Sequence, residues 1–107
     1  MKRFLIVESR DPFEAASFAA RNGLHVALAG DAEVTVFLVE NAVLAARAAV
    51  AAIVLGGLRA AGVQVLADEF ALQERGIAAG QLAAGVEAAS LDRLVVELGR
   101  GAKAIWC

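Results

Sequence analysis

Cysteine is nearly absent from this sequence, with one in 107 residues. A single cysteine excludes an internal disulfide framework and a thiolate cluster for zinc. Charge of one sign is also missing, because the net charge is −2 and acidic and basic residues are interspersed. The chain therefore has no basic stripe for nucleic-acid phosphates and no acidic tail, and we expect no nucleic-acid partner.

Long apolar runs are missing as well. The longest uncharged run near the middle, Ala48 to Leu58, has 11 residues, whereas a membrane span requires about 20. Near the amino terminus, Phe4 to Val7 is too short for the apolar segment of a secretory signal and lacks a small-residue cleavage site. We therefore expect a cytoplasmic protein with no membrane partner.

Apolar residues nevertheless dominate the composition. They make up 60% of the sequence, and the mean hydropathy is +0.66. A chain of this length forms one domain, residues 1–107, which buries only about two thirds of its unfolded surface. An apolar fraction this high exceeds what the core of one such domain needs, so we expect some of the apolar side chains to be covered by another subunit in a homo-oligomer.

Five short apolar segments have the length and composition of strands, and several are rich in Val and Ile. They are Arg3–Glu8, Glu33–Val39, Gln64–Ala67, Val86–Ala88 and Ala102–Trp106. The continuous apolar run of the first is typical of a strand that is buried on both faces.

Helical segments alternate with these strands. They are a helix from Pro12 to about Ala29 with Asp11 as its N-cap, a helix from Leu44 to Ala61, a short turn that ends at Arg75 and Gly76, and a helix from Leu91 to about Leu98 capped by Ser90. The glycine-rich segment Gly76–Gly85 is predicted to be a loop with at most one helical turn. The alternation predicts an α/β fold, three layers α/β/α, around a mostly parallel sheet of about five strands.

Acidic residues follow several of the predicted strands. Glu8, Glu40, Asp68 and Glu69 all fall at carboxyl ends, which meet at one edge of a parallel sheet. Such carboxylates could together bind a hard cation such as Mg²⁺. The alternative is that they are solvated loop residues, with Asp68 capping the next helical turn.

A phospho-acceptor site of receiver type does not fit this edge. It requires an acidic pair after the first strand, where this chain has Ser9 and Arg10, and a lysine after the last strand, whereas Lys103 begins it. A small-ligand pocket remains a hypothesis. Its residues would be Glu8, Ser9, Arg10, Asp68 and Glu69.

Three further side chains are candidates for chemistry. Arg75, beside Gly76 on a loop at the sheet edge, could bind an anion or a neighbouring subunit's carboxylate, and a salt bridge to Glu69 or Glu74 is equally available. Cys107 is the only sulfur nucleophile, and it is either a sulfur carrier or a bystander, because the terminal carboxylate beside it opposes thiolate formation. His25 lies within the first helix without a catalytic partner and is interpreted as structural or merely exposed.

Three segments together resemble a known family. They are FLIVESRDPF at the start, EVTVFLVENAVLAAR across the second strand, and AAGVQVLADEFALQERGI across the third. Their order and spacing are similar to those of the DsrE/DsrF/DsrH family, the small α/β sulfur-relay proteins that include TusB, TusC and TusD. The resemblance covers Lys2 to Trp106, and it implies a DsrE-like fold assembled as a trimer or hexamer.

The resemblance also implies where catalysis would occur. Active members carry a persulfide on a cysteine directly after the third strand, a few residues before an Arg-Gly pair, and the matching position here is Asp68. A carboxylate cannot take up sulfane sulfur. We therefore expect a non-catalytic partner or scaffold in sulfur transfer, without a cofactor or metal, that binds other sulfur-relay proteins. The alternatives are a persulfide carrier using Cys107, or a small-ligand or metal-binding pocket at the strand ends that includes Arg75.

Overall fold

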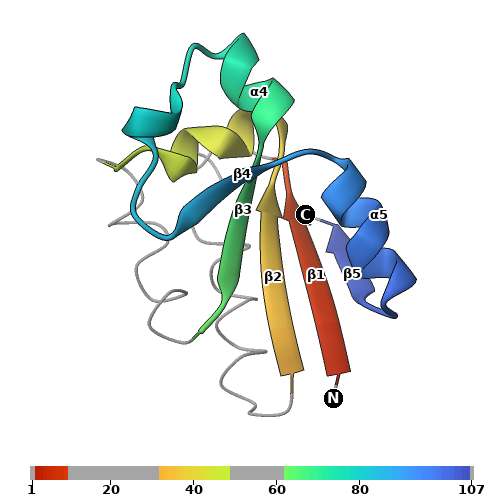
Figure 1. Ribbon diagram of the computed structural model, residues 1–107. Coiled ribbons are helices and arrows are strands. Elements are labelled where there is room, and N and C mark those ends of the chain that lie inside the picture. The colour runs from red at the N-terminus through yellow and green to blue at the C-terminus, as the bar shows by residue number, and fades with distance from the viewer. Residues whose placement is uncertain (1, 10–31, 49–61, 107) are drawn as a thin grey trace.

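The computed structural model describes residues 2–9, 32–48 and 62–106, which contain five strands and four helical segments (Figure 1). In chain order they are β1 (Lys2–Glu8), β2 (Ala32–Leu38), the 3-10 helix η1 (Glu40–Ala46), β3 (Gln64–Asp68), α4 (Glu69–Glu74), the 3-10 helix η2 (Ala79–Gln81), β4 (Val86–Ala89), α5 (Asp92–Gly99) and β5 (Lys103–Trp106). None of these helices has the length and apolar stretch that crossing a membrane would require.

The five strands form one sheet in the order β4-β3-β2-β1-β5, and every pairing between them is parallel. This confirms the predicted α/β class and parallel sheet. The apolar run of β1 explains its place inside the sheet, because Leu5, Ile6 and Val7 are all fully buried. Both faces of β1 are covered, as its continuous hydrophobicity predicts.

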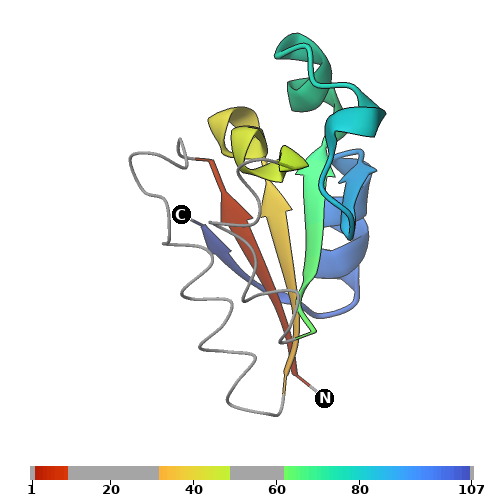
Figure 2. The same ribbon diagram turned by 90° about the vertical axis from the view of Figure 1, so that its left-hand side faces the viewer.

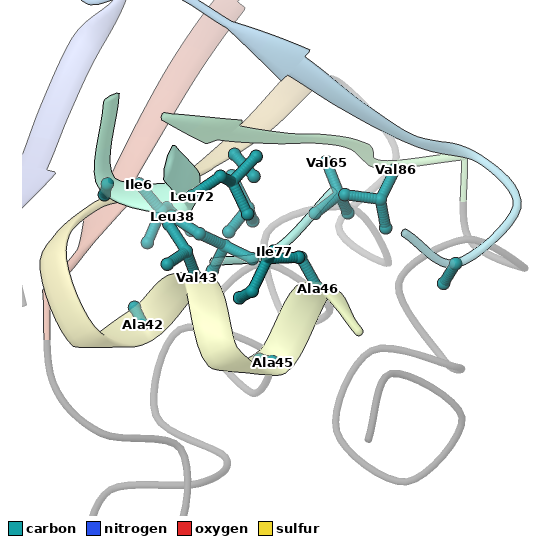
Figure 3. Close-up of a cluster of buried hydrophobic side chains, with 14 of the residues drawn as sticks. Ile6, Leu38, Ala42, Val43, Ala45, Ala46, Val65, Leu72, Ile77 and Val86 are labelled. Carbon is teal, nitrogen blue, oxygen red and sulfur yellow. The ribbon is translucent and has the colours of Figure 1, made fainter. Parts of the chain in front are cut away.

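One face of the sheet packs against η1 and α4. Ile6, Leu38 and Val65 point to this side and meet Val43 of η1 and Leu72 of α4 in the larger cluster of buried side chains (Figure 3). Alanine dominates the inward side of η1, and these small side chains let the short helix lie close to the strands. Ile77 and Val86 extend the same cluster toward β4.

The opposite face packs against α5, which lies on the other side of the sheet from η1 (Figure 2). Because side chains alternate along a strand, Leu5, Val7, Phe37 and Leu66 point to this side and form a second buried cluster. Leu94 of α5 packs on it. A single described helix therefore contributes to the covering of this face.

The second predicted helix differs from the structure at its start. Leu44 to Ala46 belong to η1, which begins at Glu40, and Arg47 is extended with φ −68° and ψ 140°. Arg47 forms an antiparallel bridge with Leu82, and the Ala83 amide donates a 2.9 Å hydrogen bond to the Ala46 carbonyl. This pairing with the loop after η2 interrupts the helix, which no local propensity could indicate. The remainder of that helix, residues 49–61, lies outside the described residues.

Other predicted elements agree more closely. The loop 76–85 carries one helical turn, η2, and β4 and β5 lie within a residue of the expected segments. Ser90 was predicted to cap α5 through its side chain, but the helix has no side-chain cap, and Ser90 contributes its carbonyl to the Arg93 amide at 3.0 Å. The first predicted helix, with His25, lies outside the described residues.

Candidate functional site

The carboxyl edge of the sheet gathers side chains from several strands on the α5 side. Val7 pairs with Trp106, and Asp68 pairs with Ala89. Alternation along β2 and β3 then places Val39 and Asp68 on the same side as Phe37 and Leu66. Strand periodicity therefore brings Val39, Asp68 and Trp106 to one corner, although 67 residues separate Val39 from Trp106 in the sequence.

At this edge of the sheet, two neighbouring strands lead into helices on opposite faces. The segment after β3 begins with α4, whose Ala71 and Leu72 pack on the η1 side, whereas the segment after β4 leads into α5 on the opposite side. Neighbouring strands whose following segments diverge in this way leave a crevice between them, and ligands of open α/β sheets bind in such crevices.

An open pocket of about 330 Å³ lies at this edge of the sheet, lined by residues of α4 and α5. That volume lies at the lower end of the range of small-molecule sites, about 300–1,000 Å³. Its described lining residues come from the ends of β2, β3 and β5 and from α4 and α5: Val39, Glu40, Asp68, Phe70, Ala71, Glu74, Leu91, Leu94 and Trp106. The pocket thus combines mainly apolar walls with three carboxylates.

Asp68 is buried at the base of α4. Its side chain is the N-cap of the helix, because Oδ2 accepts a 3.3 Å hydrogen bond from the Ala71 amide. Asp68 is only 6% exposed, so the capping alternative is confirmed and the expectation of a solvated carboxylate is wrong at this position. Among the described residues no partner is recorded for the other oxygen, Oδ1.

Glu40 contributes a second carboxylate from an unusual backbone. Its φ is +49°, in the left-handed region that non-glycine residues seldom adopt. Such a conformation costs of order 1–3 kcal/mol and persists only where the surroundings impose it. Here Glu40 begins η1 with only one residue between it and the end of β2, and its exposed side chain lines the pocket at this sharp turn.

Arg75 joins α4 to η1. Its Nε and NH2 atoms donate to Oδ1 of Asn41 at 3.2 and 2.8 Å, and NH1 donates to the Ala71 carbonyl at 3.2 Å. NH1 also lies 3.8 Å from Oε1 of Glu74. The guanidinium therefore fixes the position of α4, and Arg75 is not among the described pocket residues.

The remaining predicted site residues that the structure describes do not line this pocket. Glu8 is buried, and alternation along β1 places it on the side of Ile6. Ser9 is half-buried and Glu69 is exposed, and neither is among the described lining residues. Arg10 and Cys107 lie outside the described residues. Of the predicted acidic group, Glu40 and Asp68 alone share the pocket, and no cluster of three metal-ligating side chains occurs in residues 2–9, 32–48 and 62–106.

Several pocket residues were missed by the sequence analysis. Phe70, Glu74, Leu91 and Leu94 belong to helices whose placement relative to the strand ends depends on the strand order, which the sequence does not reveal. As an isolated aromatic residue Trp106 is most simply a packing or interface residue, but its place at the carboxyl end of β5 was a usable signal, because the same edge carries Asp68.

A family model and several solved structures match this chain over nearly its whole length. The sequence model of the DsrE/DsrF-like family matches residues 1–106, and no curated protein gives a match. A protein of unknown function from Methanobacterium thermoautotrophicum is similar in structure, with a TM-score of 0.82, 17% identity and 100% of both chains covered.

Two further solved structures have the same fold. The ychN protein from E. coli is 24% identical to this chain with a TM-score of 0.81 and 100% of both chains covered. A conserved protein of unknown function from Bacteroides thetaiotaomicron is 16% identical with a TM-score of 0.79, covering 99% of this chain and 95% of its own. At these identities the likenesses show the fold alone.

Proposed function

The chain belongs to the DsrE/DsrF-like family, a group linked to sulfur relay, and we propose that it acts in sulfur transfer as a non-catalytic, oligomeric partner or scaffold. The observation that carries this proposal is the chemistry at the end of β3. Resemblance to active members implies a persulfide-bearing cysteine at this position, and here the position is Asp68.

The geometry of Asp68 explains how the chain tolerates a carboxylate there. Its Oδ2 caps α4 through the Ala71 amide, so the side chain holds the helix that follows β3 in place. A carboxylate oxygen is not a nucleophile for sulfane sulfur in the way a thiolate is. The family scaffold is therefore retained, while the group that would carry sulfur is replaced by one that stabilises the local fold.

Mass spectrometry after treatment with a sulfane-sulfur donor tests this proposal. The wild-type protein should gain no stable sulfur adduct. An Asp68→Cys variant in a Cys107→Ser background should gain one sulfur atom, faster than a matched variant with cysteine at an exposed site outside the pocket, Gln81→Cys.

A wild-type adduct that disappears in Cys107→Ser would overturn the non-catalytic role and favour the alternative in which Cys107 carries the persulfide. Equal reaction of the Asp68→Cys and Gln81→Cys variants would show that the end of β3 is not a prepared sulfur site, and would remove the main support for the proposal.

Exposed apolar side chains support the oligomer, a homotrimer or homohexamer. Leu91, Val95 and Leu98 recur three and four residues apart, so they form one stripe along α5, and they are 51%, 68% and 45% exposed. A helix with apolar side chains on its solvent side is typical of a surface that another subunit covers. We expect the same surface to serve homo-oligomerisation in the cytoplasm and contact with sulfur-relay partners.

A second role, binding of a small ligand at the strand carboxyl ends, is favoured by the pocket itself. Thermal denaturation in the presence of a panel of amines, alcohols and carboxylates tests it. A ligand at 100 times its dissociation constant should add about 2.7 kcal/mol to the free energy of unfolding. Absence of any shift across the panel would remove this role and leave the sulfur-transfer proposal untouched.

A further inference from the structure

We propose that the pocket binds an organic ammonium ion, a small molecule with one positive nitrogen and an apolar or aromatic body. The proposal rests on the ligand-binding role and adds the chemical class of the ligand. It follows from three properties of the described pocket residues: their charge, the burial of Asp68 and the exposure of their aromatic side chains.

The described lining residues of the pocket carry charge of one sign. Glu40, Asp68 and Glu74 line it, and no Lys, Arg or His is among its described lining residues. Arg75 is the nearest cation in the sequence; its guanidinium donates to Asn41 and to the Ala71 carbonyl, and its NH1 lies 3.8 Å from Oε1 of Glu74. Among the described residues, Glu40 and Asp68 are therefore the pocket carboxylates that have no cation beside them. Such a pocket repels carboxylates and phosphates and attracts a cation.

Asp68 offers the cation a specific contact. Its carboxylate is nine-tenths buried and lines the pocket, and Oδ2 is engaged by the Ala71 amide. Among the described residues no hydrogen bond to Oδ1 is recorded, so this oxygen can accept an N–H from a ligand. A charge-assisted hydrogen bond of this kind is stronger in a partly desolvated pocket than at the open surface.

The described carboxylates suit an organic cation better than a bare metal ion. Glu40, Asp68 and Glu74 do not form a cluster that could hold a metal, and none is found in the described part of the chain. A divalent ion needs several oxygens within about 2.0–2.6 Å. An organic ammonium needs one close carboxylate and is further stabilised by others at a distance.

The walls suit an apolar body. Phe70 and Trp106 line the pocket, yet they are 63% and 67% exposed, and a ligand would bury them. Aromatic faces attract a nearby cation as well as an apolar group. Val39, Leu91 and Leu94 supply the aliphatic part of the lining, so the pocket fits a molecule that is apolar over most of its surface.

Trp106 also provides the measurement, because it is the sole tryptophan in a sequence without tyrosine. Its fluorescence should be titrated with three probes on one frame: 2-phenylethylammonium, 2-phenylethanol and 3-phenylpropanoate. We expect saturable binding of the ammonium probe with a dissociation constant at least about tenfold below those of the other two, as one charge-assisted hydrogen bond implies.

Two variants separate the site from general charge. Asp68→Asn keeps an N-cap of equal quality and should raise the dissociation constant of the ammonium probe about tenfold or more. Glu87→Gln removes the same charge from an exposed site outside the described lining, and should change it by less than about twofold because of screening. Circular dichroism should show both variants folded.

The outcomes distinguish this inference from the roles that precede it. If the alcohol or the carboxylate binds as tightly as the ammonium probe, or if Asp68→Asn binds it unchanged, the ammonium class is wrong while a ligand-binding pocket stands. If no probe changes the fluorescence, both the class and the pocket role fall. Neither result bears on whether the chain accepts sulfur.

Discussion

At the scale of single residues, Glu97 shows how a charge is kept inside this fold. It lies near the carboxyl end of α5 and is 6% exposed. Its Oε1 accepts a hydrogen bond from Nε of Arg93 at 3.4 Å and lies 3.9 Å from NH1 of Arg100. Both arginine side chains remain partly in water, so the buried carboxylate is paired with cations that keep part of their hydration.

This arrangement predicts an asymmetry between two substitutions. Arg93→Ala should cost about 1–3 kcal/mol, because it leaves a buried carboxylate with only the longer contact to Arg100. Glu97→Gln should cost less, about 0–1 kcal/mol, because the two exposed arginines are simply solvated. Urea denaturation of both variants measures the difference, and a larger loss for Glu97→Gln would contradict it.

Residue-level prediction from the sequence succeeded where the cause was local. Asp68 as a cap could be inferred, since an N-cap depends on residues within one turn. The burial of Glu97 could not be inferred, because it depends on the surface that α5 covers. The same holds for Arg75, whose main partner, Asn41, is 34 residues away.

At the scale of elements, the end of α4 depends on one glycine. Gly76 follows the helix with φ +67°, and a Cβ built on it meets nothing within 4 Å. Space is therefore not the constraint at this position; the left-handed backbone is.

Gly76→Ala should thus lower the free energy of unfolding by about 1 kcal/mol through backbone strain alone. Gly80→Ala is the matched control, because Gly80 has equal space and no left-handed φ. Its stability should stay within about 0.5 kcal/mol of wild type. Chemical denaturation of the pair tests this, and equal losses would show that the left-handed conformation does not decide the cost.

The apolar stripe on α5, Leu91, Val95 and Leu98, yields a prediction about assembly. Val95→Glu should shift the protein toward a monomer of about 11.0 kDa, because a charge at the centre of an apolar interface is not paired. Light scattering after size-exclusion chromatography measures the mass. Gln81→Glu, at an exposed site on η2, should leave the oligomer intact, and a wild-type monomer would refute the expected assembly.

Element boundaries were predictable only where no distant segment intervened. The apolar runs located the strands because each run must be buried within a sheet. The predicted start of the second helix was wrong because Arg47 pairs with Leu82, which comes 35 residues later in the sequence. Local propensity cannot include such a contact.

At the scale of the whole molecule, the sheet joins two apolar layers through side chains of the central strands. Phe37 of β2 is fully buried on the α5 side, while Val36 and Leu38 beside it are buried on the η1 side. Loss of volume at Phe37 therefore affects the centre of the domain.

Phe37→Ala should cost about 3–5 kcal/mol, a large part of the stability of a domain this small. Phe70→Ala removes the same atoms from a side chain that is 63% exposed and should cost less than about 1 kcal/mol. Thermal and urea unfolding compare the two variants. A loss of stability for Phe37→Ala as small as that for Phe70→Ala would mean that the buried layer on the α5 side contributes little.

The fold class could be predicted from the sequence because alternating apolar strands and helices permit few arrangements. The pocket could not be predicted in full. It depends on the strand order and on the crossing of α5 to the opposite face, neither of which is written in any single segment. Sequence reasoning therefore identified Asp68 and missed most of the apolar and aromatic walls.

The pairing of β5 with β1 has a consequence for synthesis of the chain. β1 is synthesised well before β5, and one of its edges is completed only when residues 103–106 arrive. At about 5–20 residues per second, that edge stays unpaired for several seconds on every nascent chain. An open strand edge is a template for pairing with another polypeptide, so the speed of translation between β1 and β5 sets how long each new copy is vulnerable to misassembly.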